Sequence, residues 1–281
     1  MPFQNCCNFE VEKKKRTMKK LLILLAAGMM AVSCSLHIDG WVGQCTEEGI
    51  DYTEIRDIAH FDAVSSGLPC NIYYNQADQQ EVRVETTQEF ADDILTKVED
   101  GTLKLKLAEG YYPKLVLRVV ISSPDIEGIS ISGSGSLFHE GALHASKDLS
   151  LRVSGSGDIV AGNIDSKDFK AHVSGSGSIR LSSVSCDGFE ATTSGSGSVD
   201  IETIHAKDDA SARVSGSGRI RLHEVDVNGD MDLKTSGSGS IFVNGRCRDV
   251  KATTSGSGNI SGSLSYTGIH TTTSGSGRVD L

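Results

Sequence analysis

The second half of the chain alternates apolar and polar positions with a period of two. From Phe169 to Leu181 the odd-numbered positions hold Phe, Ala, Val, Gly, Gly, Ile and Leu. Side chains two residues apart share one face of a β-strand, so this alternation predicts strands with one buried face. The same register recurs from Phe189 to Ile201. The pattern therefore predicts one kind of strand, repeated along the chain.

The repeat is marked by the string Ser-Gly-Ser-Gly, which appears eight times from Ser132 onward. The copies begin at Ser132, Ser154, Ser174, Ser194, Ser215, Ser236, Ser255 and Ser274. Each copy follows Ile, Val or Thr, and an aliphatic residue comes two positions after it, which a flexible linker would not maintain. The intervals of 19 to 22 residues match one coil of a β-solenoid.

We therefore predict an all-β fold for residues 132–281, a single-stranded, right-handed parallel β-helix with coils of about 20 residues. The glycines are expected to face inward at the coil corners, where a missing side chain lets the backbone bend, and the serines outward. The predicted corner glycines are Gly155, Gly157, Gly175, Gly177, Gly195, Gly197, Gly216, Gly218, Gly237, Gly239, Gly256 and Gly258. A further aliphatic column, Ile164, Val184, Ile204 and Val225, predicts about three strand-like stretches per coil.

Residues 56–131 are β-rich but lack the repeat, and we expect them to start the solenoid and cap it. Predicted strands are Ala63–Ser65, Asn71–Asn75, Glu81–Thr86, Leu103–Leu107 and Leu115–Ile121. Gln88–Lys97 is expected to be a short helix or a turn, and Asp100-Gly101 the turn of a hairpin. Residues 34–55 are expected to be a tether.

The N-terminus has the pattern of an export signal. Met18-Lys19-Lys20 precedes an apolar run that is too short to span a membrane. The run ends in Ala31-Val32-Ser33-Cys34, which looks like a bacterial lipobox, so we expect residues 18–33 to be removed and Cys34 to carry lipid. Ordinary cleavage next to a cysteine is the alternative. Residues 1–17 are interpreted as an over-called start. This predicts an envelope protein, anchored by lipid at the outer membrane.

The net charge limits the kinds of ligand, and the spacing of the cysteines limits which of them can form disulfides. Without residues 1–33 the chain keeps 27 − 6 = 21 basic and 37 − 2 = 35 acidic residues, a net charge of −14 that disfavours nucleic acid. Cys45 and Cys70 are candidates for a disulfide in an oxidising compartment, although the sequence does not fix their separation. Cys186 and Cys247 share a column three coils apart, roughly 14 Å, which is too far to bond.

Motifs for chemistry are absent from the sequence. The repeat lacks the Gly-x-Ser-x-Gly spacing of a hydrolase nucleophile, phosphate-binding loops are missing, and only Asp158 follows a glycine pair as a calcium roll would need. We therefore expect no cofactor, no metal and no catalytic residue. The charged residues that a carbohydrate-active enzyme on this scaffold would use are Asp200, Glu202, Glu224, Asp226, His223 and Arg221. Charged residues on the exterior of a solenoid are more often only a solvated face.

The chain resembles the family described as putative auto-transporter adhesin, head GIN domain. The resemblance rests on Phe61–Gly67, on Ile126–Ser132 leading into the first Ser-Gly-Ser-Gly, and on the columns that follow, and covers roughly residues 57–281. It implies a β-helix-like fold and an envelope location, and it supplies no catalytic residues.

We therefore predict a non-catalytic binding or adhesion module with a protein or polysaccharide ligand. Its open last coil leaves self-association as a second kind of contact. The alternatives are a carbohydrate-active enzyme on the same scaffold, and an envelope sensor or assembly component that binds a small or lipidic ligand. The regular 19-to-22-residue intervals leave little room for the long loops of an enzymatic cleft, which favours a binding surface.

Overall fold

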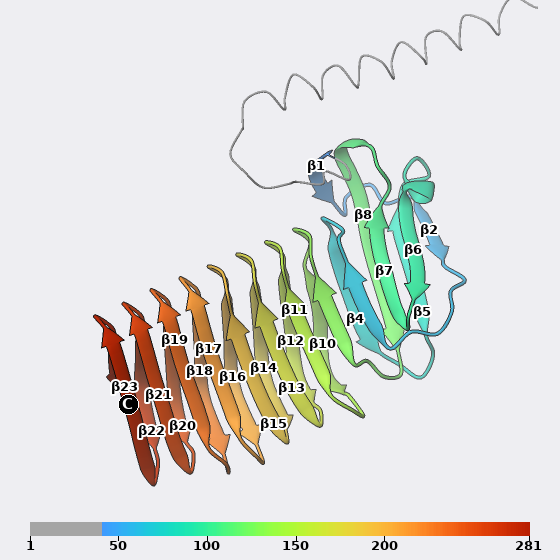
Figure 1. Ribbon diagram of the computed structural model, residues 1–281. Helices are drawn as coiled ribbons and strands as arrows, with labels where there is room; N and C mark the ends of the chain where they lie inside the picture. The colour runs from blue at the N-terminus through green and yellow to red at the C-terminus, as the bar shows by residue number, and fades with distance from the viewer. Residues whose placement is uncertain (1–40) are drawn as a thin grey trace, which may run out of the picture. The chain divides into compact units, whose positions relative to one another are not determined.

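The computed structural model describes residues 41–281, which fold as a β-solenoid built from two sheets (Figure 1). The larger sheet contains, in spatial order, β2 (Tyr52–Ile55), β5 (Glu81–Thr86), β8 (Tyr111–Ser123), β4 (Asn71–Gln76), β10 (Leu137–His144), β12 (Asp158–Asp165), β14 (Ser178–Cys186), β16 (Ser198–Ala206), β18 (Arg219–Val227), β20 (Ser240–Arg246), β22 (Asn259–Ser265) and β24 (Arg278–Asp280), with β1 (Trp41–Thr46) paired to β8. The smaller sheet contains β23 (Gly268–Gly275), β21 (Asp249–Gly256), β19 (Met231–Gly237), β17 (Ala210–Gly216), β15 (Gly188–Thr193), β13 (Asp168–Val173), β11 (Leu149–Val153), β9 (Gly128–Ile131), β3 (Ala63–Ser66), β7 (Thr102–Leu107) and β6 (Ile94–Glu99).

Each repeat supplies one strand to each sheet. β11 runs in the smaller sheet, the Ser-Gly-Ser-Gly turn follows, and β12 runs in the larger sheet before the next coil begins. Successive strands pair in parallel, with Val153 opposite Val173 and Ile159 opposite Ile179. Equivalent residues of the repeat therefore stack directly on one another, and the predicted β-solenoid with coils of about 20 residues is confirmed.

The prediction of three strand-like stretches per coil is wrong, because the coil has two. Residues 158–165 form a single strand, β12, across the predicted break. The break is instead a shift of the alternation within that strand, since both Ala161 and Ile164 are buried although they lie an odd number of residues apart. The strand bends there without ending.

The Ser-Gly-Ser-Gly turns lie between the two sheets, as predicted, but their glycines are needed for a different reason. The second glycine of each turn is buried, while the first is at least partly exposed, so only the second faces inward. A Cβ on Gly177 would lie 1.9 Å from the carbonyl oxygen of Gly157, and one on Gly175 would lie 2.0 Å from that of Gly155. Any side chain here would collide with the preceding coil. Glycine is required because the coils stack closely on one another, more than because the backbone approaches the axis of the solenoid.

The space between the sheets is filled by columns of identical or similar side chains. Phe169 and Phe189 stack in adjacent coils with ring centroids 5.9 Å apart, in the offset geometry that aromatic pairs favour. One column breaks the apolar rule: Thr193, Thr235 and Thr254 are buried, and their hydroxyl groups have no hydrogen-bond partner. An unpaired buried hydroxyl costs stability, so the column is tolerated rather than optimal.

Antiparallel strands cover the N-terminal end of the solenoid. β5 pairs with β8, β2 with β5, and β6 with β7, all antiparallel, whereas the repeat is parallel throughout. The hairpin predicted at Asp100-Gly101 joins β6 to β7, and both residues have the positive φ (49° and 71°) of a tight hairpin turn. Within the predicted Gln88–Lys97 helix or turn there is a single 3-10 turn, Ala91–Asp93, after which β6 begins.

The order of strands in this region does not follow the chain. β3 and β4 form a coil that lies between β7–β8 on one side and β9–β10 on the other, although β5 to β8 come later in sequence. The chain therefore makes one coil, leaves it to build the cap, and returns past it to start the repeat. Phe61, Leu68 and Tyr74, which are fully buried, anchor this coil in the core.

The tether predicted for residues 34–55 is wrong from Trp41 onward. β1 pairs with the first half of β8, and β2 forms an edge of the larger sheet, because residues 52–55 supply a partner for the free edge of β5. The over-called start, the signal peptide and Cys34 lie outside the described residues. Within 41–281, no helix is both long and apolar enough to cross a membrane.

Candidate functional site

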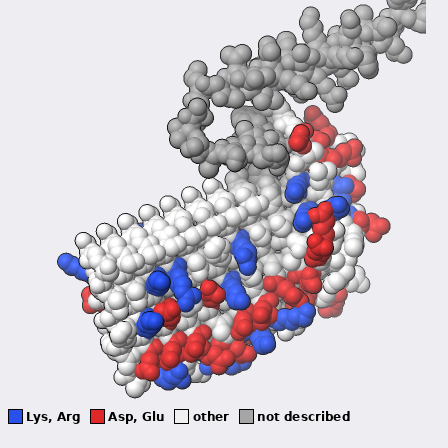
Figure 2. Space-filling view, viewed as in Figure 1, with Lys and Arg blue, Asp and Glu red and all other residues white. Residues whose placement is uncertain are grey.

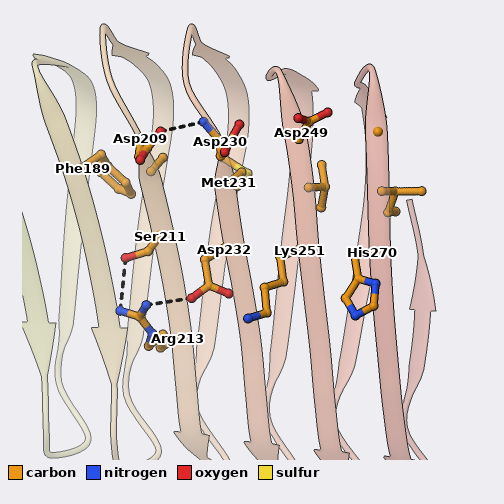
Figure 3. Close-up of a pocket in the computed structure, with 14 residues that line it drawn as sticks. Phe189, Asp209, Ser211, Arg213, Asp230, Met231, Asp232, Asp249, Lys251 and His270 are labelled. Carbon is orange, nitrogen blue, oxygen red and sulfur yellow. Dashed lines mark hydrogen bonds and ion pairs between the residues drawn. The ribbon is translucent and has the colours of Figure 1, made fainter.

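A groove of about 730 Å³ crosses the outer face of the smaller sheet, from β15 to β23 (Figure 3). It runs perpendicular to the strands, so each coil contributes the same few positions to its floor. The side chains that line it include six charged ones, Asp209, Arg213, Asp230, Asp232, Asp249 and Lys251. The groove is open along its length, which suits an extended ligand better than a compact one.

One wall of the groove is a column of aspartates. The pairing of Ala210 with Met231, and of Met231 with Val250, places the preceding residues Asp209, Asp230 and Asp249 on successive coils. The Asp209 carboxylate accepts a hydrogen bond of 2.8 Å from the backbone N–H of Asp230. Hydrogen bonding from Arg248 lowers the pKa of Asp230, so this carboxylate is ionised at neutral pH.

The floor of the groove carries charges of both signs. Ser211, Asp232, Lys251 and His270 occupy one column on four consecutive strands. Arg213 joins two coils, because its guanidinium lies 2.8 Å from the Asp232 carboxylate and 3.6 Å from that of Glu190. The groove therefore presents paired and unlike charges at a spacing of about one coil, roughly 4.8 Å.

Charge is distributed unevenly over the solenoid. Figure 2 shows Lys, Arg, Asp and Glu gathered along one side of the repeat, while a long band of regularly spaced uncharged residues runs beside them. The serines of the Ser-Gly-Ser-Gly turns are exposed or half-exposed all along the repeat. The repeat thus offers a ligand two different long surfaces, one charged and one bearing hydroxyl groups.

The candidate catalytic residues are only partly brought together. On the outer face of the larger sheet, ligand atoms of Asp200, Glu202 and His223 lie within 4.8 Å of one another, close enough in principle to hold a metal ion. The two carboxylate oxygens of Asp200 are already engaged, however, by His223 Nε2 at 2.8 Å and by Arg221 at 3.1 Å. The guanidinium of Arg221 opposes the binding of a metal cation at Asp200. The Asp200 carboxylate therefore belongs to a half-exposed ion-pair network.

The other two carboxylates belong elsewhere. Arg246 binds both oxygens of Asp226 at 2.7 Å and lowers its pKa, and His205 approaches the same carboxylate at 3.9 Å. Glu224 lies opposite Thr203, in a different column from Asp200. Asp226 borders a small hollow of about 220 Å³ with His205 and Lys207. The six residues therefore do not form one catalytic constellation.

An aromatic surface pair was not predicted. Tyr73 and Phe138 stack on the outer face of the larger sheet with ring centroids 5.7 Å apart, and the Arg118 guanidinium lies 5.7 Å from the Tyr73 ring centroid. The two residues are far apart in sequence and are joined only by the pairing of β4 with β10. Sequence periodicity carries no signal for them. The aspartate column did carry one, since each aspartate directly precedes the apolar start of a strand.

Solved structures of bacterial proteins share the fold. A putative lipid binding protein from Parabacteroides distasonis is 21% identical with a TM-score of 0.70, covering 84% of this chain and 99% of its own. A putative adhesin from Parabacteroides distasonis (20%, TM-score 0.74) covers 82% of this chain and 95% of its own, and one from Parabacteroides merdae (18%, 0.73) covers 86% and 98%. No curated protein matches the chain.

The family model matches almost all of the described fold, over residues 60–247 and 202–281. These ranges include the coil formed by β3 and β4, most of the cap, and every Ser-Gly-Ser-Gly turn. The chain belongs to the family described as putative auto-transporter adhesin, head GIN domain.

Proposed function

We propose that the chain is an envelope-anchored, non-catalytic adhesion module that holds an extended ligand in the groove on the smaller sheet. The observation that carries this proposal is the groove itself, which spans β15 to β23 and presents an aspartate at the same position of three successive coils. Membership of an adhesin family supports a binding role. Extended concave or flat surfaces of repeat proteins commonly serve this purpose.

The charges of the groove favour a protein segment with basic side chains as the ligand. Asp209, Asp230 and Asp249 form a carboxylate column, and the chain has a formal net charge of −10. Such a surface attracts cationic groups and repels anionic polymers. A lipidic ligand, which the name of one structural relative suggests for that relative, would require an apolar surface, and this groove is lined by four carboxylates.

The groove is tested by binding, with matched variants. Asp209→Asn and Asp249→Asn together remove two negative charges while retaining hydrogen-bond acceptors, and Asp187→Asn, a half-exposed carboxylate outside the groove, is the control. A protein array and a glycan array probed side by side identify the ligand. We expect a protein ligand whose affinity falls at least tenfold in the double variant and is unchanged in the control.

Other outcomes decide among the alternatives. A ligand that binds the double variant as well as the unaltered protein would place the binding site outside the groove. Binding to glycans alone would replace the protein ligand with a polysaccharide, and release of reducing ends from a bound glycan would identify an enzyme.

We further propose that lipid on Cys34 anchors the protein in the outer membrane. The support is the Ala31-Val32-Ser33-Cys34 pattern and the envelope association of the family. Replacing Cys34 with Ala should move the protein from the membrane fraction to the soluble fraction. Sedimentation of the Cys34→Ala variant with membranes would show that the anchor lies elsewhere.

A further inference from the structure

Two cysteines lie end to end on neighbouring strands of the cap. β1 pairs with β8 from Tyr111 to Val116, and β4 pairs with β8 from Arg118 to Ser123. Cys45 lies opposite Leu115, and Asn71 lies opposite Arg118, which puts Cys70 opposite Leu117. The two cysteines are thus separated by two positions along one strand, on the same inward face.

Contacts between the two strands hold this arrangement in place. Glu47, just after β1, accepts hydrogen bonds from the Asn71 side chain at 2.8 Å and from the Tyr73 hydroxyl at 3.0 Å. The sulfur of Cys45 lies 3.9 Å from the carbonyl oxygen of Leu117, which is the residue opposite Cys70. Each of the two thiols perturbs the pKa of the other, so the two side chains lie near one another.

We propose that Cys45 and Cys70 form a disulfide bond that fastens β1 to the beginning of β4. A spacing of two strand positions is about 6.6 Å between Cα atoms, within the range that disulfides span. Both side chains point to the same face, because an even number of strand positions separates the residues that they oppose on β8.

The reaction is a thiol–disulfide exchange with a disulfide oxidant such as oxidised glutathione. The Cys45 thiolate attacks one sulfur of the oxidant, which forms a mixed disulfide and releases one glutathione thiol. The Cys70 sulfur, after losing its proton, attacks the Cys45 sulfur and releases the second glutathione. Two protein thiols are oxidised and one external disulfide is reduced to two thiols.

The two thiols are suited to these different steps. Hydrogen bonding from Cys70 lowers the pKa of Cys45, which is also the more exposed of the two. The same hydrogen bond and burial raise the pKa of Cys70. Attack on an external disulfide needs an accessible thiolate, so Cys45 reacts first and Cys70 completes the bond.

The other two described cysteines provide an internal contrast. Cys186 and Cys247 are buried in the repeat, where burial raises the pKa of Cys186 to about 12 and that of Cys247 to about 11. The strand register places them three coils apart, with Ala206 and Val227 between. Neither has a partner at bonding distance among residues 41–281, and we expect both to stay reduced under conditions that oxidise the cap pair.

The bond would fix the strand that leads from the predicted lipid site into the fold. Cys45 lies 11 residues after Cys34. A pull between the anchor and a bound ligand would then act on a covalent cross-link rather than on the hydrogen bonds of β1 with β8. This consequence rests on the proposed function, whereas formation of the bond does not.

Peptide mapping tests the disulfide directly. The full chain is incubated, folded, with oxidised glutathione, free thiols are alkylated, and the unreduced protein is digested with trypsin. Arg56 separates the two cysteines, so a disulfide links two peptides, one of which is Asp57–Arg83 with Cys70 as its single cysteine. We expect this linked pair to be the main form of Cys70, and to disappear on reduction.

Variants assign the partner. Because the peptide with Cys45 also holds Cys34, the Cys45→Ser variant is needed: the linked pair must vanish in it and persist in the control variant Cys186→Ser. Alkylated Cys70 in the oxidised, folded protein would overturn the proposal. So would a linked pair that survives Cys45→Ser, since Cys70 would then be bonded to Cys34.

Discussion

The cap and the repeat are both built from β-strands, but they are stabilised in different ways. In the repeat, every coil from β11 to β24 pairs in parallel with a near-copy of itself, and one rule about glycine and alternation serves all of them. In the cap, three antiparallel pairings, a coil inserted out of chain order and a 3-10 turn have no counterpart in the repeat. The repeat is stabilised by neighbours of its own kind, and the cap by contacts that cannot be exchanged.

The largest expected effect comes from deletions that respect or violate the coil. Removing residues 174–193 takes out one whole coil and joins Val173 to the next Ser-Gly-Ser-Gly, so the protein should still fold, as circular dichroism and a cooperative melt would show. Removing residues 178–187 deletes half a coil and should prevent folding. Removing residues 81–100, equal in length to the whole coil, should also prevent folding, because β5 and β6 have no substitute.

A half-coil deletion that melts cooperatively would contradict the stacked register. Survival of the cap deletion would show that the solenoid ends without help from β5 and β6, and the contrast between the two regions would disappear.

The contrast also explains what the sequence could predict. The alternation around Ser-Gly-Ser-Gly identified the coils, the buried second glycines and the exposed serines, because stacking forces each coil to repeat its neighbour. It placed a strand break near Ile164 where there is only a bend, since a shift of alternation looks the same in both cases. Hydrophobic periodicity shows which residues of one strand are buried, and the repeat length shows which residues of neighbouring coils lie opposite one another.

Elsewhere the partner of a strand is set by contacts distant in sequence. β1 lies along β8, some 70 residues later, and β3 lies between β7 and β9. Neither the pairing of β1 nor the topology of the cap can therefore be predicted from the local pattern of the sequence. The same holds for the candidate site. Asp200, His223 and Arg221 share a face that the repeat length predicts, while Tyr73 with Phe138 depends on the irregular coil.

Reduction of the proposed disulfide should destabilise the protein through the cap. Cross-linking Cys45 to Cys70 closes a loop of about 25 residues, and such a loop contributes about 3 kcal/mol to the free energy of unfolding. Urea denaturation of the oxidised and the reduced protein should differ by this amount. Cys186→Ser, in the repeat, should retain the difference, and Cys45→Ser should abolish it. An equal response of both variants would show that the difference does not come from a disulfide in the cap.

Alkaline pH should weaken the cap through Tyr112. Burial, together with the nearby Asp93 carboxylate, raises the pKa of Tyr112 to about 12, above the ordinary value of 10. A raised pKa means that its stabilisation is complete below pH 10 and is lost as the pH rises through 12. Two pKa units correspond to about 2.7 kcal/mol, and partial solvation of the hydroxyl reduces this to about 1 kcal/mol.

Urea midpoints of the unaltered protein at pH 9 and pH 12 measure this loss. The Tyr112→Phe variant should lose about 1 kcal/mol less between the two pH values. Identical pH dependence in both proteins would exclude Tyr112 as the source.

The smallest effect should be a gain, in the repeat. Thr254 is fully buried and its hydroxyl has no partner, whereas Val153 and Val173 occupy the same column in earlier coils. Thr254→Val removes the unpaired hydroxyl and should raise the free energy of unfolding by about 1 kcal/mol. The exposed Thr272→Val is the matched control and should leave it unchanged. A loss of stability in Thr254→Val would mean that the hydroxyl is satisfied inside the core.

The stacking requirement for glycine is the claim on which the solenoid depends, and one pair of variants tests it directly. A Cβ on Gly177 meets the preceding coil at 1.9 Å, while neighbouring Ser176 is exposed. Urea denaturation of Gly177→Ala should therefore show a loss of about 3 kcal/mol, and Ser176→Ala a change of no more than about 0.5 kcal/mol. Equal losses in the two variants would contradict the stacked register of the coils.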